Sequence, residues 1–285
     1  MNILVLGGNG YLGSKIVKQL VLKNSHVFST IREQSDLSRL NDIKDNINFV
    51  NAKYQDIDNM LSDVRIDCIV NMVCDYGRCA NIDMIHSNLM FPLEVLELAA
   101  KNKVNKFITV GTALPVDLNL YSFSKNSFSE FGRFYTEKYG LNFMDLKVQM
   151  YYGSDEPQDR FIPSTISKMI RGDVVNTTYG TQLRDIIAVD DVVNLIIGVI
   201  DREFSGFNSI DIGTGIAPSI SELIDFIWEK TEKKSVVNKG AVPMRPNEPD
   251  CIADVSEMLR ILNYKPIYWK YGISKMIDEI RRGIR

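Results

Sequence analysis

Apolar runs of strand length alternate with longer amphipathic stretches through the first half of the chain. Pro92 lies inside the third of the amphipathic stretches, at about 83–102, and should end or kink the first turns of that helix. Such alternation is typical of a parallel sheet with helices on both faces, so the pattern predicts an α/β, doubly wound, Rossmann-like domain. The strand-like runs are residues 2–7, 26–31, 47–50, 67–73, 106–111 and 142–149, and the helical patterns are about 11–23, 57–62, 83–102 and 122–139.

The alternation changes after residue 150. Residues 153–157 predict a loop, 161–171 a helix, and 180–187 a strand that leads into residues 189–193. We expect a first domain at 1–153 and 183–214, and a smaller C-terminal lobe at 154–182 and 215–285. Prolines 243, 246 and 249 predict a long loop near the centre of that lobe.

A glycine-rich turn follows the first apolar run. Glycines allow a tight turn and a close approach to phosphate, and the next helix offers unpaired N–H groups, so this turn suits the pyrophosphate of a dinucleotide. The alternative is an ordinary glycine turn at a strand end. The candidate cofactor contacts are Gly7, Asn9, Gly10, Tyr11, Leu12 and Gly13.

Three further residues predict redox chemistry. Residues 121–125 read Tyr-Ser-Phe-Ser-Lys, and Thr112 stands just beyond the run at 106–111. Reduction of a ketone develops negative charge on oxygen, which requires a proton donor and a hydrogen bond. Tyr121 can donate the proton, and the Lys125 cation on the same helix face favours its phenolate form. Alternatively, Tyr121 is an ordinary buried aromatic residue and Lys125 a solvated charge.

Composition limits the classes of partner. The chain has 285 residues, 45% of them hydrophobic, and 33 Lys and Arg against 36 Asp and Glu. This size can bury a full core, whereas the net charge of -3 argues against nucleic acid as the main partner. No stretch approaches the ~20 apolar residues of a membrane span and no charged leader precedes the first run, so we expect a soluble, cytoplasmic protein.

The cysteines and histidines have no metal-ligand spacing. We therefore expect no metal site, and we interpret the cysteines as reduced thiols. Cys68 should belong to the core, while Cys74 and Cys79 fall in the predicted active-site loop, either as reactive thiols or merely as neighbours of the site. The residues concerned are Cys68, Cys74, Cys79, Cys251, His26 and His86.

These motifs together resemble the extended short-chain dehydrogenase/reductase family, over nearly the whole chain. The matching elements are Gly7-x-x-Gly10-x-x-Gly13, Asn71-Met-Val73, Thr112, Tyr121-x-x-x-Lys125 and Arg184-Asp-Ile-Ile-Ala-Val-Asp-Asp-Val192. Within the family, the chain looks most like 4-keto-sugar reductases of the CDP-abequose and CDP-paratose synthase type. That closer likeness lies in Asp75-Tyr-Gly77, Asn88, Arg160-Phe-Ile-Pro163 and Arg184.

The resemblance implies a role for each matching residue. Tyr121 would donate the proton, Lys125 would hold the nicotinamide ribose, and Thr112 would hydrogen-bond the reacting oxygen. Residues 71–73, Asn71, Met72 and Val73, would contact the cofactor, and Asn88 would support the loop and the lysine. The first domain would bind the dinucleotide and the C-terminal lobe a nucleotide sugar. Three acids, Asp185, Asp190 and Asp191, are expected to brace the strand-to-helix turn.

The end of the second strand predicts the cofactor. It reads Ser29-Thr-Ile-Arg32, where NAD-preferring folds place an acid. An arginine and two hydroxyls suit a 2′-phosphate, so we expect NADPH. The alternative is that Arg32 points to water and Glu33 supplies the acid one position later. Lys53 also stands where relatives commonly have an acidic residue near the adenine.

The expected reaction is reduction of the 4-keto group of a nucleoside-diphosphate 4-keto-6-deoxy or 3,6-dideoxy sugar, for a surface polysaccharide such as lipopolysaccharide. Dehydratases of the family carry an Asp-Glu pair after the threonine, where this chain has Ala113 and Leu114. An NAD-retaining 4-epimerase remains open because it needs no extra acid. A non-catalytic NADP(H)-binding regulator is an alternative of another class.

Arginines are the expected contacts of the substrate. Arg184 and Arg245 suit a diphosphate, although Arg245 can equally be a surface ion-pair partner. Asp75, Tyr76 and Arg78 follow the fourth strand at its carboxyl end, where ligands collect. We favour Tyr76 as a sugar contact, since Asp75 can instead cap the following turn.

The helix at 122–139 carries three aromatic residues at helical spacing, Phe128, Phe131 and Tyr135. These side chains suit either the core or the contact face of a homodimer. We favour a homodimer.

Overall fold

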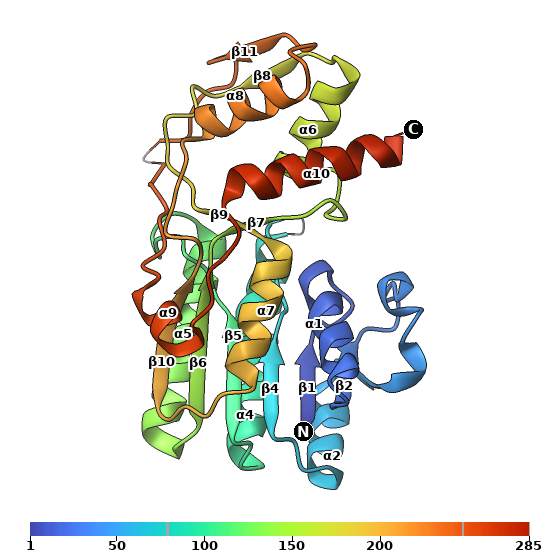
Figure 1. Ribbon diagram of the computed structural model, residues 1–285. Helices are drawn as coiled ribbons and strands as arrows, with labels where there is room; N and C mark the ends of the chain where they lie inside the picture. Colours follow the sequence, from blue (N-terminus) through green and yellow to red (C-terminus); the bar gives the residue numbers. More distant parts are fainter. Residues whose placement is uncertain (78–79, 247, 285) are drawn as a thin grey trace. The chain divides into compact units, whose positions relative to one another are not determined.

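The computed structural model describes residues 1–77, 80–246 and 248–284, and its first compact unit contains the predicted doubly wound sheet. Seven strands form this sheet in the order β10-β6-β5-β4-β1-β2-β3. The five register-resolved pairings among β1 to β6 are all parallel, which confirms the α/β, Rossmann-like fold class (Figure 1). The strands are β1 Asn2–Leu6, β2 His26–Ile31, β3 Ile47–Asn51, β4 Cys68–Asn71, β5 Lys106–Val110, β6 Asn142–Val148 and β10 Phe207–Ile212.

Helices cover both faces of the sheet. The helices α2, α4 and α5 pack beside one another on one face, and α1 and α7 lie on the other (Figure 1). They bury apolar side chains against the strands, because each helix carries its hydrophobic residues along one stripe. The bounds are α1 Tyr11–Leu22, α2 Tyr54–Asp63, α3 Asn81–Ile85, α4 Phe91–Lys101, α5 Leu120–Tyr139 and α7 Val189–Ile200, with 3-10 turns at Ser38–Leu40 and Lys44–Asn46.

Pro92 has the expected effect on its helix. It lies in the first turn of α4, and the turn before it, His86–Met90, is π-helical. A proline has no N–H to donate to the preceding turn, so regular α-helical bonding is interrupted there. The long predicted helix at 83–102 is therefore three consecutive pieces.

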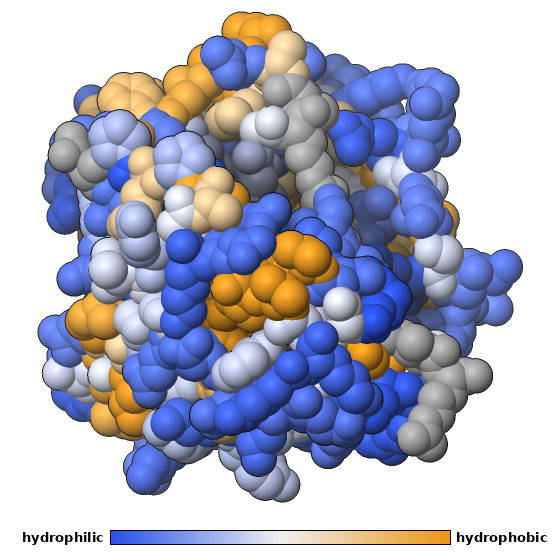
Figure 2. All heavy atoms as spheres, turned by 90° about the horizontal axis from the view of Figure 1, so that it is seen from above, coloured by the Kyte–Doolittle hydropathy of each residue, from blue (hydrophilic) through white to orange (hydrophobic). Residues whose placement is uncertain are grey.

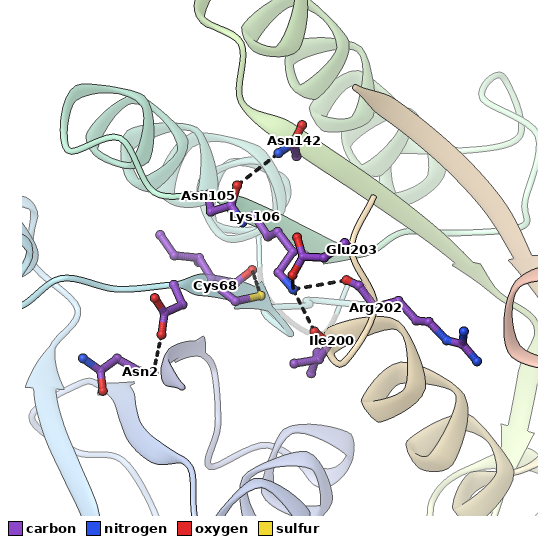
Figure 3. A network of polar contacts seen from close by, with 10 residues as sticks. Asn2, Cys68, Asn105, Lys106, Asn142, Ile200, Arg202 and Glu203 are labelled. Atoms are coloured by element: carbon purple, nitrogen blue, oxygen red, sulfur yellow. Dashed lines mark hydrogen bonds and ion pairs between the residues drawn. The ribbon is translucent and has the colours of Figure 1, made fainter. Parts of the chain in front are cut away.

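A buried lysine connects two elements at the amino ends of the strands (Figure 3). Lys106 begins β5 and is only 2% exposed. Its Nζ donates to the carbonyl oxygens of Ile200 and Arg202, at 3.0 and 3.1 Å, and pairs with Glu203 at 3.4 Å. These carbonyls lie at the C-terminal end of α7, where the helix dipole favours a cation. The buried ammonium is thus compensated.

The second compact unit is built around helices and short strand pairs. Its apolar core includes Ile166, Leu223, Trp269 and Ile273, none more than 2% exposed. Strand β8 pairs with β11 and β7 with β9, both in parallel. The elements are β7 Met150–Tyr152, α6 Phe161–Arg171, β8 Val175–Thr177, β9 Ile186–Ala188, α8 Ile220–Lys230, β11 Val237–Lys239, α9 Ser256–Leu262 and α10 Trp269–Ile284.

Backbone contacts divide the chain at somewhat different places from the expected boundaries. The first unit comprises residues 1–147 and 193–210, and the second 148–192 and 211–285. The strand predicted over 180–187 is also wrong in extent, since only residues 186–188 form a strand and Leu183 and Arg184 make isolated bridges. Glycine at 180 has φ +69°, so the chain turns there and cannot begin a regular strand.

The described helices include none that is both long and apolar enough to span a membrane. The face drawn in Figure 2 is mostly hydrophilic, and its hydrophobic residues gather in separate patches. Among the aromatic residues expected on the core or dimer face of α5, Phe128 is 1% exposed and belongs to the core. Phe131 is 40% exposed, and Tyr135 packs partly against the core.

Candidate functional site

The glycines of the turn between β1 and α1 stand where a side chain would meet neighbouring atoms. A Cβ on Gly13 would lie 2.3 Å from the carbonyl oxygen of Gly7, which itself has φ +74°. Gly10, which precedes α1, has no side chain to cap the first helical turn. An exposed helix start behind such a turn binds anions well, so the geometry fits a pyrophosphate.

The other residues predicted to contact the cofactor in this turn differ in their surroundings. Asn9 donates through Nδ2 to the carbonyl oxygen of Asp36, at 3.3 Å. The ring of Tyr11 has the Lys15 ammonium 5.4 Å and the Arg39 guanidinium 5.5 Å from its centroid. Leu12 is 7% exposed and is part of the core.

A pocket of about 490 Å³ lies at the carboxyl ends of β2 and β3. Exposed Arg32, directly after β2, lines it, as do Glu33 and Lys53. The Lys53 ammonium pairs with the Glu33 carboxylate at 2.9 Å, and this bond and charge lower the pKa of Glu33. The acid that could serve a ribose is therefore already bonded to a cation.

The two hydroxyls predicted beside Arg32 have another role. Thr30 is 3% exposed and its Oγ1 accepts from the Gly7 backbone N–H at 3.2 Å. Ser29 is fully buried, and a Cβ on Gly8 would lie 2.4 Å from its Oγ. Thr30 therefore bonds the glycine turn and Ser29 packs against it, and neither hydroxyl lines the pocket of Arg32, so their assignment to a 2′-phosphate is wrong.

Thr112 and Tyr121 lie after the sheet's central strands. Thr112 follows β5, is 6% exposed, and accepts through Oγ1 from the Leu114 backbone N–H at 3.2 Å. Tyr121 lies in the first turn of α5, which Asn119 and Ser122 close with a reciprocal capping box. This cap determines where the helix begins, and hence the position of the tyrosine.

Lys125 lies one turn after Tyr121 and is 3% exposed, so it is not the solvated charge of the alternative interpretation. Its Nζ donates to the carbonyl oxygen of Val73, at 3.3 Å. Val73 in turn donates its N–H to Oδ1 of Asn71, whose Nδ2 bonds Oγ1 of Thr109. Residues 71–73 are thus held between β5 and the lysine, with the Met72 N–H on the carbonyl of Leu6.

Asn88 holds the loop that follows β4. It is fully buried in the π-helical turn, accepts from the Asp75 N–H and donates to the Asp75 carbonyl, both at 2.8 Å. Its Nδ2 also approaches Oγ of Ser124 at 3.3 Å. Oδ1 of Asp75 accepts from the Gly77 N–H at 2.8 Å, as expected if this acid caps the turn. Arg78 and Cys79 lie outside the described residues.

Two residues of the same loop contact Tyr121. The Tyr76 ring stacks on it, with centroids 5.1 Å apart and planes at 27°. The Cys74 thiol lies 3.8 Å from the Tyr121 hydroxyl. The thiol contact was not predicted, because no periodicity connects residues 47 positions apart.

In the second unit, Arg184 is 7% exposed and ion-paired with Glu248. Its guanidinium also donates to the carbonyl oxygens of Leu183 and Pro249. Sequence reasoning missed Glu248, which lies in the predicted proline-rich loop between β11 and α9. Arg245, in the same loop, is exposed.

Two of the three acids expected to brace the strand-to-helix turn, Asp185 and Asp191, instead bond other segments of the second unit. Buried Asp185 accepts from the N–H and Oγ1 of Thr214, from the Gly215 N–H and from the Ala253 N–H. Buried Asp191, in the first turn of α7, accepts from the Tyr264 hydroxyl and the Ile267 N–H, while Asp190 in the same turn is exposed. The carboxylates of Asp185 and Asp191 are therefore occupied with structural bonds.

Glu156 is a further acid that sequence reasoning did not identify. It is 5% exposed and lies 3.3 Å from the Arg160 guanidinium. Burial raises its pKa to about 7, against the opposing effect of Arg160. This carboxyl therefore changes protonation near neutral pH.

Comparison with known proteins identifies the family. The model of the NAD dependent epimerase/dehydratase family matches residues 3–213. CDP-abequose synthase of Salmonella muenchen is 26% identical over 97% of this chain and 97% of its own. A putative UDP-glucose 4-epimerase of Methanocaldococcus jannaschii is 25% identical over 99% of both chains.

Solved structures share the fold. UDP-glucose 4-epimerase of Thermotoga maritima, determined with UDP-glucose, superposes with TM-score 0.86 at 21% identity over 100% of both chains. UDP-glucuronic acid 4-epimerase of Bacillus cereus, determined with UDP-glucuronic acid and NAD, gives 0.85 at 22% identity over 99% of both. From the match over residues 3–213, the chain belongs to the NAD dependent epimerase/dehydratase family, that is, to the extended short-chain dehydrogenases/reductases.

Proposed function

We propose that the protein is an NADPH-dependent reductase of the 4-keto group of a nucleoside-diphosphate 4-keto-6-deoxy or 3,6-dideoxy sugar. The observation that carries this proposal is the pocket beyond β2 and β3, where Arg32 stands beside a Glu33 already bonded to Lys53. A guanidinium binds a 2′-phosphate through charge-assisted bonds. Because Glu33 is paired with Lys53, its carboxylate repels that phosphate less than an unpaired carboxylate would.

The catalytic roles follow from the chemistry of three side chains. Tyr121 gives its hydroxyl proton to the ketone oxygen as that oxygen becomes an alcohol, and Thr112 donates a hydrogen bond to it. Buried Lys125 favours the phenolate that Tyr121 leaves behind. A bound nicotinamide cofactor would supply the hydride. The glycine-rich turn at residues 7–13 would hold its pyrophosphate.

For the substrate, we propose that residues 154–182 and 215–285 bind the nucleotide sugar, while 1–153 and 183–214 bind the dinucleotide. Arg184 and Arg245 would contact the diphosphate, and Tyr76 the sugar. Because Arg184 is paired with Glu248, a diphosphate would compete with that carboxylate for the guanidinium. The exposed aromatic side chains of α5, Phe123, Phe131, Phe134 and Tyr139, support a homodimer through this helix.

The test supplies the purified protein with NADPH or NADH and with CDP-, dTDP- and GDP-linked 4-keto-6-deoxy sugars in parallel. We expect loss of reduced-nicotinamide absorbance with NADPH, and NMR of the product identifies the nucleoside and the new alcohol. Tyr121→Phe should lower turnover by ~100-fold or more while the cofactor still binds. The proposal would be overturned if no keto sugar caused a loss of absorbance, or if the Tyr121→Phe variant kept the turnover of the wild-type protein.

A 4-epimerase that retains NAD is the second candidate. It is supported by the two structural neighbours described above, which are named as 4-epimerases of UDP sugars. Such an enzyme would release NAD on denaturation and would interconvert sugars without net use of cofactor. Nucleotide analysis of the denatured protein distinguishes the two candidates. A non-catalytic NADP(H)-binding regulator would instead keep its biological effect in the Tyr121→Phe variant.

A further inference from the structure

The loop after β4 reaches Tyr121 with two side chains. The Sγ atom of Cys74 lies 3.8 Å from the tyrosine hydroxyl, and the Tyr76 ring stacks on the tyrosine ring. Cys74 is a half-buried free thiol. In this pair the S–H is a donor and the tyrosine oxygen an acceptor.

The backbone on both sides of Cys74 is held by buried polar groups. Before it, the Val73 N–H is bonded to Asn71 and the Val73 carbonyl to the Lys125 ammonium. After it, both the N–H and the carbonyl of Asp75 are bonded to the buried amide of Asn88. Hydrogen bonds on both sides therefore hold the backbone that carries the thiol.

The same network holds the helical turn that carries the tyrosine. Asn88 approaches Oγ of Ser124, and that hydroxyl donates to the Tyr121 carbonyl oxygen at 2.8 Å. One buried amide thus connects the loop with the first turn of α5. The distance between the thiol and the phenol is set by this shared support.

We propose that Cys74 is a positioning residue for Tyr121. The Cys74 thiol donates a hydrogen bond to the phenol oxygen of Tyr121 and so favours the phenolate form of the tyrosine. The inference rests on the proposed function, in which Tyr121 cycles between phenol and phenolate. Lys125 stabilises the phenolate by charge, whereas the thiol does so by a directed bond. The stacked Tyr76 ring keeps the tyrosine ring in place against the thiol.

A titration that needs no substrate tests the proposal. The protein is labelled with tyrosine carrying ¹³C at Cζ, and the Tyr121 signal is identified by its absence in Tyr121→Phe. Removing the donor in Cys74→Ala should raise the titration midpoint of Tyr121 by about half a pH unit. Cys74→Ser keeps a donor and should recover at least half of that shift. Cys251→Ala, a buried cysteine of the second unit, is the matched control and should leave the midpoint unchanged.

The kinetic readout is the pH profile of alcohol oxidation with NADP, which requires the phenolate. The acidic limb of this profile should move to higher pH in Cys74→Ala, by the same number of pH units as the NMR titration midpoint of Tyr121. No shift in Cys74→Ala, or equal shifts in the Ala and Ser variants, would overturn the inference. Because the NMR titration does not depend on turnover, failure of the proposed reaction appears separately, as absence of turnover in the wild-type protein.

Discussion

The Glu33 carboxylate and the Lys53 ammonium are ion-paired at 2.9 Å across the pocket that Arg32 also lines. Glu33 follows β2 and Lys53 follows β3, two strands that pair in parallel. The carboxyl ends of parallel strands meet at one edge of a sheet, which is where open α/β sheets bind their ligands. Cofactor preference is therefore expected to depend on three side chains and not on Arg32 alone.

Removal of the guanidinium tests its predicted bond to a 2′-phosphate. Arg32→Ala should weaken binding of NADPH by about 10- to 100-fold, the loss of a charge-assisted hydrogen bond, and should leave NADH binding nearly unchanged. Titration of both cofactors by fluorescence measures the two dissociation constants. Arg65→Ala, at an exposed arginine before β4, is the control. If Arg32→Ala weakened the binding of NADPH and NADH equally, a contact between Arg32 and the 2′-phosphate would be contradicted.

The ion pair makes a second prediction about the same pocket. In Lys53→Ala, the Glu33 carboxylate loses its cation and becomes available to a ribose diol, while it repels a 2′-phosphate. The ratio of NADH to NADPH affinity should rise by about 10-fold. Glu33→Gln in the Lys53→Ala background should restore much of the original ratio. An unchanged ratio in Lys53→Ala would show that the pair has no part in cofactor choice.

Asn88 connects the loop of Cys74 to α5, so its removal should affect both stability and turnover. Asn88→Ala breaks two 2.8 Å bonds to Asp75 in a fully buried place. We expect a loss of about 2–3 kcal/mol in the free energy of unfolding, and a lower kcat. Denaturant unfolding and steady-state kinetics measure the two. Asn59→Ala, at an exposed position on α2, should change neither. Normal kcat in a correctly folded Asn88→Ala protein would argue against a role for this support in catalysis.

Glu156 predicts a pH dependence of stability. Its pKa is raised to about 7 from 4.5, so the folded state holds a proton that the unfolded state has released between these pH values. The free energy of unfolding therefore falls as pH rises through this window. Compared with the wild-type protein, Glu156→Gln should be similar in stability at pH 4.5 and more stable at pH 8, by about 2–3 kcal/mol.

Denaturant unfolding across this pH range measures the difference. Glu222→Gln, at a side chain that is 53% exposed, is the matched control and should show no such dependence. Parallel pH curves for the wild-type and Glu156→Gln proteins would mean that this carboxyl ionises normally in the folded state.

Much of the fold followed from local patterns in the sequence. Strand and helix alternation predicted the parallel sheet, and residues 161–171 form the predicted helix with the same bounds. The glycine turn at residues 7–13 was also predictable, because a steric requirement for glycine depends on neighbours only a few residues away. These features reflect periodicity and backbone geometry, which act over short distances along the chain.

The partners of the polar side chains depended on the tertiary structure. Whether Glu33 was free or paired, and whether the hydroxyls of Ser29 and Thr30 faced the pocket or the glycine turn, depended on residues brought together by the sheet. The same holds for Arg184 with Glu248, 64 positions apart, and for Cys74 with Tyr121, 47 positions apart. Hydrophobic patterning requires only that one face of an element be apolar, whereas a hydrogen bond requires two particular atoms at one distance. The sequence by itself therefore determined the layers and the strand ends at which ligands collect, and only the packed chain decided which polar atoms meet there.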